Sequence, residues 1–166
     1  MSKAYKYKNS KKIILIKMES EEGENNKNDN DECTILHESV SIIDHRYKII
    51  IIGDAGVGKT CLTVKLSSGK FEEQSSPTLG FDYSAIHLKY KGKILKLEIW
   101  DTCGQEAYRS LVSNFYVNSS LAVVVYAIDA QESFNSIEEW LRQVKNHCSP
   151  ETKIVLIGNK ADLDDK

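Results

Sequence analysis

A glycine-rich stretch at residues 53–60 has the composition and spacing needed to bind phosphate. Its sequence, GDAGVGKT, follows an apolar run at residues 47–52 and precedes residues 61–66, which can continue as a helix. Glycines let backbone N–H groups turn inward around phosphate oxygens, and a helix that begins there adds the positive end of its dipole. In such a loop Lys59 reaches the β- and γ-phosphates, and the Thr60 hydroxyl is a Mg²⁺ ligand. A glycine-rich turn before an ordinary helix is the alternative, but the strand–loop–helix order argues against it.

A phosphate loop alone is compatible with ATPases, kinases and GTPases, so the later motifs must decide between them. The sequence WDTCGQE at residues 100–106 ends an expected strand. There Asp101 can hold the Mg²⁺ shell through water, the Gly104 N–H can meet the γ-phosphate, and Gln105 can orient an attacking water. A polar strand end without further function is the weaker interpretation.

The sequence GNKADL at residues 158–163 identifies the base. The Asp162 carboxylate can accept hydrogen bonds from both N1–H and the 2-amino group of guanine, whereas adenine offers neither donor and would leave the charge unpaired. Asn159 can bond the other side of the base and contact the phosphate loop, and the Lys160 stem can lie along the base plane. Asn-Lys after a strand is also a common turn, so this motif gains its weight from the two before it. An ATPase is therefore a poor alternative.

A Pro-Thr pair supplies a candidate for the second hydroxyl ligand of Mg²⁺. Thr78 lies about midway in sequence between Thr60 and Asp101. Its hydroxyl can bind the metal only while a γ-phosphate holds the surrounding loop closed.

Strands and helices alternate from residue 47 onward, which predicts an α/β fold with a largely parallel, doubly wound sheet. Residues 81–90 and 93–100 are expected to form a hairpin with Lys91 and Gly92 in its turn, as the one antiparallel edge of that sheet. The continuous apolar runs at residues 121–126 and 154–157 are typical of strands buried on both faces.

One helix is predicted between these two buried strands. The apolar residues recur there at helical spacing and indicate core packing rather than a ligand site. They are Phe134, Ile137, Trp140, Leu141 and Val144.

Composition and charge fit an ordinary protein of 166 residues with 41% hydrophobic and 28% charged residues. The net charge of −2 offers no basic field, so no nucleic-acid partner is expected. The four cysteines are scattered without a C-x-x-C pair, which favours reduced thiols, and no sorting signal is recognisable. We therefore expect a cytoplasmic protein.

Residues 1–46 are expected to be an extension that is largely disordered, because residues 19–32 are polar and acidic. Residues 13–16 form a short apolar island, and residues 35–43 show loosely helical spacing. Either apolar segment is a candidate to cover part of an exposed sheet face.

Taken together, GDAGVGKT, PTLGFDY, WDTCGQE and GNKAD resemble the pattern of Ras-like small GTPases. LEIWDTCGQE, YRSL and LGFDY resemble the Rab branch, which regulates vesicle traffic, and residues 108–166 are most similar to the Rab subgroup that works at the Golgi. The resemblance covers residues 47–166. It implies a P-loop NTPase domain that is a GTP-binding switch and hydrolyses GTP with Mg²⁺.

The resemblance also implies roles for individual residues. Catalysis would involve Gln105 and Lys59. Metal binding would involve Thr60 and Thr78 directly, and Asp101 through water. The implied nucleotide-binding set is Gly53, Ala55, Gly56, Val57, Gly58, Lys59, Thr60, Cys61, Phe71, Thr78, Gly104, Asn159, Lys160 and Asp162. Tyr83, Trp100 and Phe115 match an aromatic triad that contacts effectors, with ordinary packing as the alternative. An exchange factor and an activating protein are the other implied partners.

Two departures from the family pattern bear on activity. Ala55 stands where Rab proteins usually have Ser, close to the space that Gln105 needs, and this predicts slow hydrolysis. The sequence ends at Lys166, after the guanine motif, so we expect a domain truncated after its fifth strand, without a prenylated cysteine or lipid anchor. Endomembrane association at the Golgi or on vesicles would then be transient. A hydrolysis-deficient or unstable decoy that binds GTPase regulators is the alternative function.

Overall fold

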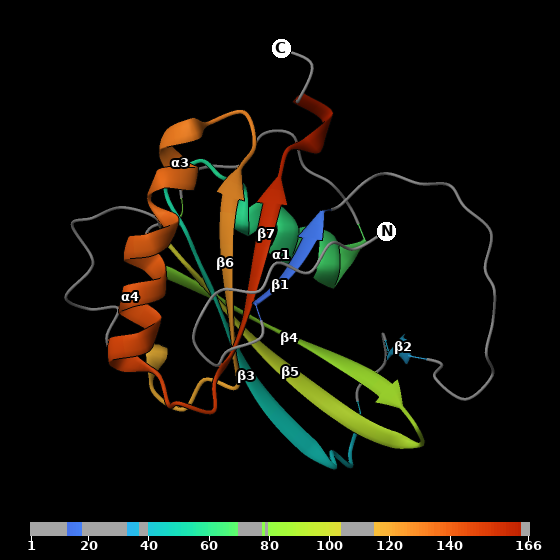
Figure 1. Ribbon diagram of the computed structural model, residues 1–166. Coiled ribbons are helices and arrows are strands. Elements are labelled where there is room, and N and C mark those ends of the chain that lie inside the picture. The colour runs from blue at the N-terminus through green and yellow to red at the C-terminus, as the bar shows by residue number, and fades with distance from the viewer. Residues whose placement is uncertain are drawn as a thin grey trace.

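In the computed structural model, one twisted sheet forms the centre of the protein (Figure 1). The residues that the structure describes are 13–17, 33–36, 40–69, 78, 80–103 and 115–163. The strands are β1 (Ile13–Lys17), β2 (Cys33–Leu36), β3 (His45–Ile52), β4 (Phe81–Tyr90), β5 (Lys93–Thr102), β6 (Leu121–Ala127) and β7 (Lys153–Asn159). The helices are α1 (Lys59–Ser68), α3 (Gln131–Asn135) and α4 (Ile137–His147), with a 3₁₀ turn η2 (Ala161–Leu163). Within these residues the sheet has seven strands in the order β1-β7-β6-β3-β5-β4-β2.

The first five strands in this order, which are β1, β7, β6, β3 and β5, run parallel to one another. β3 pairs with β5 on one side and with β6 on the other, and β6 pairs with β7. Parallel strands end at the same edge of a sheet, and ligands of open α/β sheets bind outside that edge. The C-terminal ends of β3, β5 and β7 therefore lie at one edge, and each of the three sequence motifs includes residues at one of these ends.

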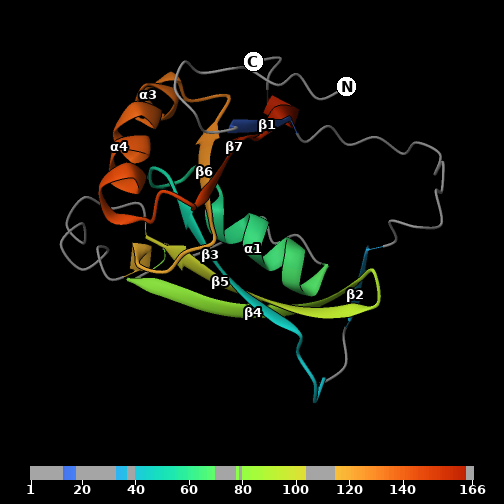
Figure 2. The same cartoon turned by 60° about the horizontal axis from the view of Figure 1, so that its bottom comes forward.

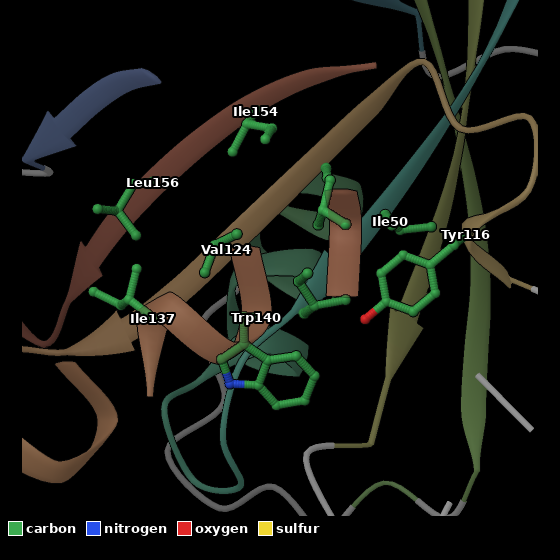
Figure 3. Close-up of a cluster of buried hydrophobic side chains, with 10 residues drawn as sticks. Ile50, Tyr116, Val124, Ile137, Trp140, Ile154 and Leu156 are labelled. Atoms are coloured by element: carbon green, nitrogen blue, oxygen red, sulfur yellow. The ribbon is translucent and has the colours of Figure 1, made fainter. Parts of the chain in front are cut away.

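Alternation along β3 builds a core on each face of the sheet. Ile50 and Ile52 are fully buried in a cluster with Trp140 and Val144 of α4, and Ile51 belongs to a second cluster on the other face. Figure 2 shows α1 and the α3–α4 pair on opposite faces of the sheet, and Figure 3 shows the cluster around Trp140. Burying each such side chain contributes about 1.5–3 kcal/mol. The α/β fold with a mostly parallel sheet and helices on both faces is confirmed.

The predicted hairpin of β4 and β5 is also confirmed. Its register runs from Phe81 opposite Thr102 to Tyr90 opposite Lys93. Lys91 and Gly92 have φ values of 49° and 76°, and positive φ at both turn residues matches the right-handed twist of the two strands. The hairpin is not the edge of the sheet, however, because β2 adds an antiparallel strand outside β4.

Residues 1–46, which were expected to be a largely disordered extension, include two strands that the sequence analysis did not predict, while residues 1–12, 18–32 and 37–39 lie outside the described residues. β1 pairs in parallel with β7, from Ile13 opposite Ile154 to Lys17 opposite Gly158. The loosely helical spacing of residues 35–43 was misleading, since Ile35 lies in β2. Pairing at a sheet edge needs only a short extended run of backbone, which a periodicity argument does not detect. The apolar island extends the sheet edge rather than covering a face.

None of the helices described is long and apolar enough to cross a bilayer.

The parallel pairing of β1 with β7 makes a testable contribution to stability. We expect the double substitution Ile14→Pro and Leu15→Pro to lower the free energy of unfolding by about 1–3 kcal/mol, because every second residue of a strand bonds to its neighbour and proline has no N–H to donate. Thermal unfolding and amide hydrogen exchange of β7 measure this loss. Ile14→Val with Leu15→Val is the matched control that keeps both N–H groups. Equal melting temperatures for the proline and valine variants would contradict the pairing.

Candidate nucleotide-binding site

The loop between β3 and α1 has the backbone geometry of an anion cradle. Gly53, Gly56 and Gly58 have φ values of 144°, 76° and 93°, which L side chains rarely adopt. A Cβ at Gly53 would lie 2.1 Å from the Val125 carbonyl oxygen, so the backbone approach itself requires glycine there. Gly58 is the N-cap of α1, and no side chain caps that helix. The first N–H groups of α1 are thus available to an anion.

Lys59 places its ammonium group within this loop. The residue is only 6% exposed, and its Nζ donates hydrogen bonds to the carbonyl oxygens of Gly53, at 2.9 Å, and Asp54, at 2.7 Å. Burial lowers the pKa of Lys59, while the nearby charges of Asp101, Cys103 and Asp54 oppose that shift. A buried cation held by two carbonyl dipoles is suited to a phosphate group, which would supply the missing opposite charge.

Three oxygen-bearing side chains meet beside the first turn of α1. Thr60 Oγ1 donates to Asp101 Oδ2 at 2.5 Å, and it lies 2.7 Å from Thr78 Oγ1. The first bond uses the Thr60 proton, so Thr78 is the donor in the second. The structure therefore brings together the three predicted metal-binding residues from α1, β5 and the segment before β4.

The chemistry of this cluster fits Mg²⁺. Asp101 is 1% exposed and its Oδ1 is buried without a hydrogen-bond partner in the structure. Burial raises the pKa of Asp101, opposed by the Thr60 hydrogen bond and by Lys59. Among the described residues no three His, Cys, Asp or Glu side chains form a metal cluster. Mg²⁺ commonly takes only one or two carboxylates and completes its shell with water and substrate phosphates, so one carboxylate and two hydroxyls are a suitable set.

The guanine motif is joined directly to the phosphate loop. Asn159 Nδ2 donates to the Val57 carbonyl oxygen at 2.8 Å. A Cβ at Gly58 would lie 2.3 Å from that same nitrogen, so the glycine is also required by this contact. Lys160 has a φ of 64°, and its Nζ lies 3.8 Å from Asp129 Oδ2. The exposed Asp162 follows in η2. One nucleotide-sized ligand can therefore contact both motifs.

The predicted aromatic triad also comes together on the surface. The ring centroids of Tyr83 and Trp100 lie 5.2 Å apart, and those of Trp100 and Phe115 lie 5.5 Å apart. The sequence analysis missed Phe81, whose ring lies 4.6 Å from that of Phe115. Phe81 and Tyr83 are 48% and 43% exposed. Their i, i+2 spacing on β4 was the available signal, because alternate residues of a strand share a face.

Trp140 makes a contact with the phosphate loop that the sequence analysis did not predict, because it assigned this residue to the core alone. Trp140 packs in the predicted core of α4, but its Nε1 also donates to Asp54 Oδ1 of the phosphate loop at 2.8 Å. Apolar spacing on a helix gives no sign of such a bond.

The remaining predicted site residues divide into two groups. Ala55 and Gly56 are exposed at the turn of the loop, Val57 is buried, and Cys61 lies half-buried in the first turn of α1. Phe71, Gly104 and Gln105 lie outside the described residues, so their predicted roles stay predictions.

Comparison with known proteins adds an independent observation. The sequence model described as "Ras family" matches residues 48–166. The chain is 47% identical over 116 residues to "Ras-related protein Rab-4" of Dictyostelium discoideum, covering 70% of this chain and 57% of that protein. It is 38% identical over 120 residues to "Ras-related protein RABA1b" of Arabidopsis thaliana (72% and 56%). It is also 38% identical over 122 residues to "Ras-related protein RAB1BV" of Beta vulgaris (74% and 57%).

The chain thus spans little more than half the length of these relatives. The family match nevertheless covers the phosphate loop, the Asp101 segment and the guanine motif, whose side chains the fold brings to one edge. On both grounds, the chain belongs to the Ras family and is Rab-like within it.

Proposed function

We propose that this chain is a GTP-binding switch that hydrolyses GTP to GDP and phosphate with Mg²⁺. The observation that carries the proposal is the hydrogen bond from Asn159 to the Val57 carbonyl, because it joins the base-reading motif to the phosphate loop. A ligand that satisfies both must contain a base and phosphates. Asp162 is the residue whose charge selects guanine.

The chemistry depends on positioning and charge rather than on a covalent intermediate. Lys59 and the loop N–H groups hold the β- and γ-phosphates, and Gln105 orients a water. The oxygen of that water attacks the γ-phosphorus while the bond to the β–γ bridging oxygen breaks; GDP leaves with the bridging oxygen, and the proton of the water passes to a phosphate oxygen. When bound, Mg²⁺ would neutralise phosphate charge, and Thr60 and Thr78 would hold it directly while Asp101 would hold it through water.

The switch follows from the placement of Thr78 beside Thr60. Loss of the γ-phosphate removes the ligand that favours this contact, so Thr78 can move away from Thr60. The adjacent aromatic side chains of Phe81, Tyr83 and Trp100 would change with it, which suits effectors that bind the GTP form. An exchange factor and an activating protein would set the rates.

We place this switch in vesicle-mediated transport, in the cytoplasm with transient association with Golgi or vesicle membranes. The resemblance of residues 108–166 to the Golgi Rab subgroup supports this assignment.

Hydrolysis is tested by single-turnover phosphate release from GTP bound to the purified protein. We expect Gln105→Leu to slow release by at least about tenfold, because the attacking water is no longer oriented. GTP retention should change little, since the amide contacts water rather than the base. Absence of phosphate release from the unsubstituted protein, even with an activating protein, would favour the hydrolysis-deficient alternative.

Base selection is tested by Asp162→Asn. The amide cannot accept from two guanine donors as the carboxylate does, so GTP affinity should fall by about ten- to a hundredfold while ATP affinity stays low. Competition binding with GTP, ATP and xanthosine triphosphate measures the change. Glu151→Gln, which removes an exposed carboxylate before β7, is the control and should leave GTP affinity unchanged. Equal affinity of the unsubstituted protein for GTP and ATP would refute guanine selection.

The Asp101 carboxylate links the metal site to stability. Its folded-state pKa lies above the ordinary value of 3.8, so the native state binds the proton more readily than the unfolded state. The free energy of unfolding of the ligand-free protein should therefore fall as pH rises from that ordinary value through the raised one. Asp101→Asn should remove this dependence and stabilise the ligand-free protein at neutral pH by on the order of 1 kcal/mol.

The same Asp101→Asn substitution should weaken the Mg²⁺ dependence of nucleotide retention. Urea unfolding in EDTA between acid and neutral pH gives the stability, and nucleotide release with and without Mg²⁺ gives the binding. A substitution that destabilised the ligand-free protein at neutral pH would contradict the direction of the Asp101 shift.

A further inference from the structure

We propose that Trp140 is a positioning residue for the phosphate loop, because its indole N–H holds the Asp54 carboxylate on the α4 side of the sheet. The contact is a hydrogen bond of 2.8 Å from Trp140 Nε1 to Asp54 Oδ1, between residues 86 positions apart in sequence. This inference rests on the proposed nucleotide-binding function and adds a side chain from outside the three motifs.

The position of the donor is fixed by core packing. Trp140 is 7% exposed and lies in the cluster with Ile50, Val124 and Val144. Figure 3 shows its ring within this cluster, with the indole nitrogen directed away from Ile50 and Tyr116. An indole nitrogen can only donate, and a largely buried one needs an acceptor. The packing of α4 thereby determines where the acceptor, Asp54, must lie.

The acceptor is connected to the phosphate-binding lysine. The backbone carbonyl of Asp54 accepts from Lys59 Nζ at 2.7 Å, while its carboxylate accepts from Trp140. Trp140, Asp54 and Lys59 thus form one continuous hydrogen-bonded chain from the α4 core to the ammonium group. The Asp54 charge also acts on Lys59, since it is among the groups that raise the lysine pKa against the effect of burial.

A carboxylate in a phosphate-binding loop carries an electrostatic cost. If the Asp54 side chain rotated toward the bound phosphates, it would repel them and compete with them for the Lys59 charge. Trp140 holds the carboxylate on the side of α4, whereas α1, whose N-terminus faces the phosphates, packs on the opposite face of the sheet (Figure 2). The indole N–H therefore keeps a negative charge in the loop without placing it against the ligand.

The proposal is tested with Trp140→Phe, which keeps an aromatic ring in the core and removes the donor. We expect fluorescent GTP-analogue dissociation to accelerate roughly three- to tenfold, and GDP dissociation to accelerate less because GDP carries less negative charge. Amide hydrogen exchange of residues 55–58 in the nucleotide-free protein should also accelerate. Ile137→Val is the matched control, because it loosens the same core by one methylene without touching the indole N–H.

Asp54→Asn separates the charge from the hydrogen bond, since an amide oxygen still accepts from the indole. We expect Trp140→Phe to accelerate GTP-analogue dissociation less when combined with Asp54→Asn than alone, because the repelling charge is gone. An equal effect with and without Asp54→Asn would overturn the electrostatic role. If GTP-analogue dissociation and amide hydrogen exchange of residues 55–58 were no faster in Trp140→Phe than in Ile137→Val, Trp140 would act only by packing in the core.

Failure of the proposed function gives a different pattern. If the unsubstituted protein retains no guanine nucleotide, GTP binding is refuted. Amide hydrogen exchange of residues 55–58 still tests whether Trp140 positions the loop. Faster exchange of residues 55–58 in Trp140→Phe than in Ile137→Val would then support the positioning role, and equal exchange would overturn it.

Discussion

Burial of the C-terminal half of β3, on both faces and along both edges, is the constraint on which the rest of the structure depends. β3 pairs with β5 and β6, and its alternate side chains enter two separate cores. Residues 49–52 are all isoleucine, so a shift of one residue would exchange like for like in the two cores. The end of β3 is fixed instead by Gly53, because a Cβ at that position would lie 2.1 Å from the Val125 carbonyl oxygen. The residue at which the loop begins is therefore fixed.

The charges at the end of β3 explain why this rigid frame is suited to a nucleotide. Lys59 and Asp101 are both almost fully buried, and burial lowers the pKa of the first and raises the pKa of the second. Each environment thus disfavours the charged form of its group, and the two groups gain from different parts of one ligand. A phosphate would compensate the charge of Lys59 and a divalent cation would compensate the charge of Asp101, so a ligand that carries both would stabilise the charged forms of both groups.

Much of this site was predictable because its chemistry depends on residues close together in sequence. The glycine spacing at residues 53–60 implied a loop whose N–H groups turn toward phosphate, and strands were expected at residues 93–100 and 154–157, which bring Asp101 and Asn159 to that loop. The bond from Trp140 to Asp54 was not predictable, because the same apolar spacing serves a core residue whether or not its N–H finds an acceptor. Phe81 was missed because its i, i+2 spacing with Tyr83 shows only that the two residues share a face, whereas its contact with Phe115 depends on the folded structure.

The two ends of the sheet order show a further limit of sequence reasoning. Both outermost strands, β1 and β2, come from the segment that precedes the family match, and they lie at opposite edges of the sheet. An unpaired edge leaves a row of N–H and C=O groups open to association with other chains, and pairing with β1 and β2 removes that exposure from β7 and β4. β1 also ends beside Gly158, at the start of the guanine motif, so its backbone helps to hold the strand that presents Asn159. β1 is therefore part of the frame that positions residues 158–163, although its sequence carries no motif of its own.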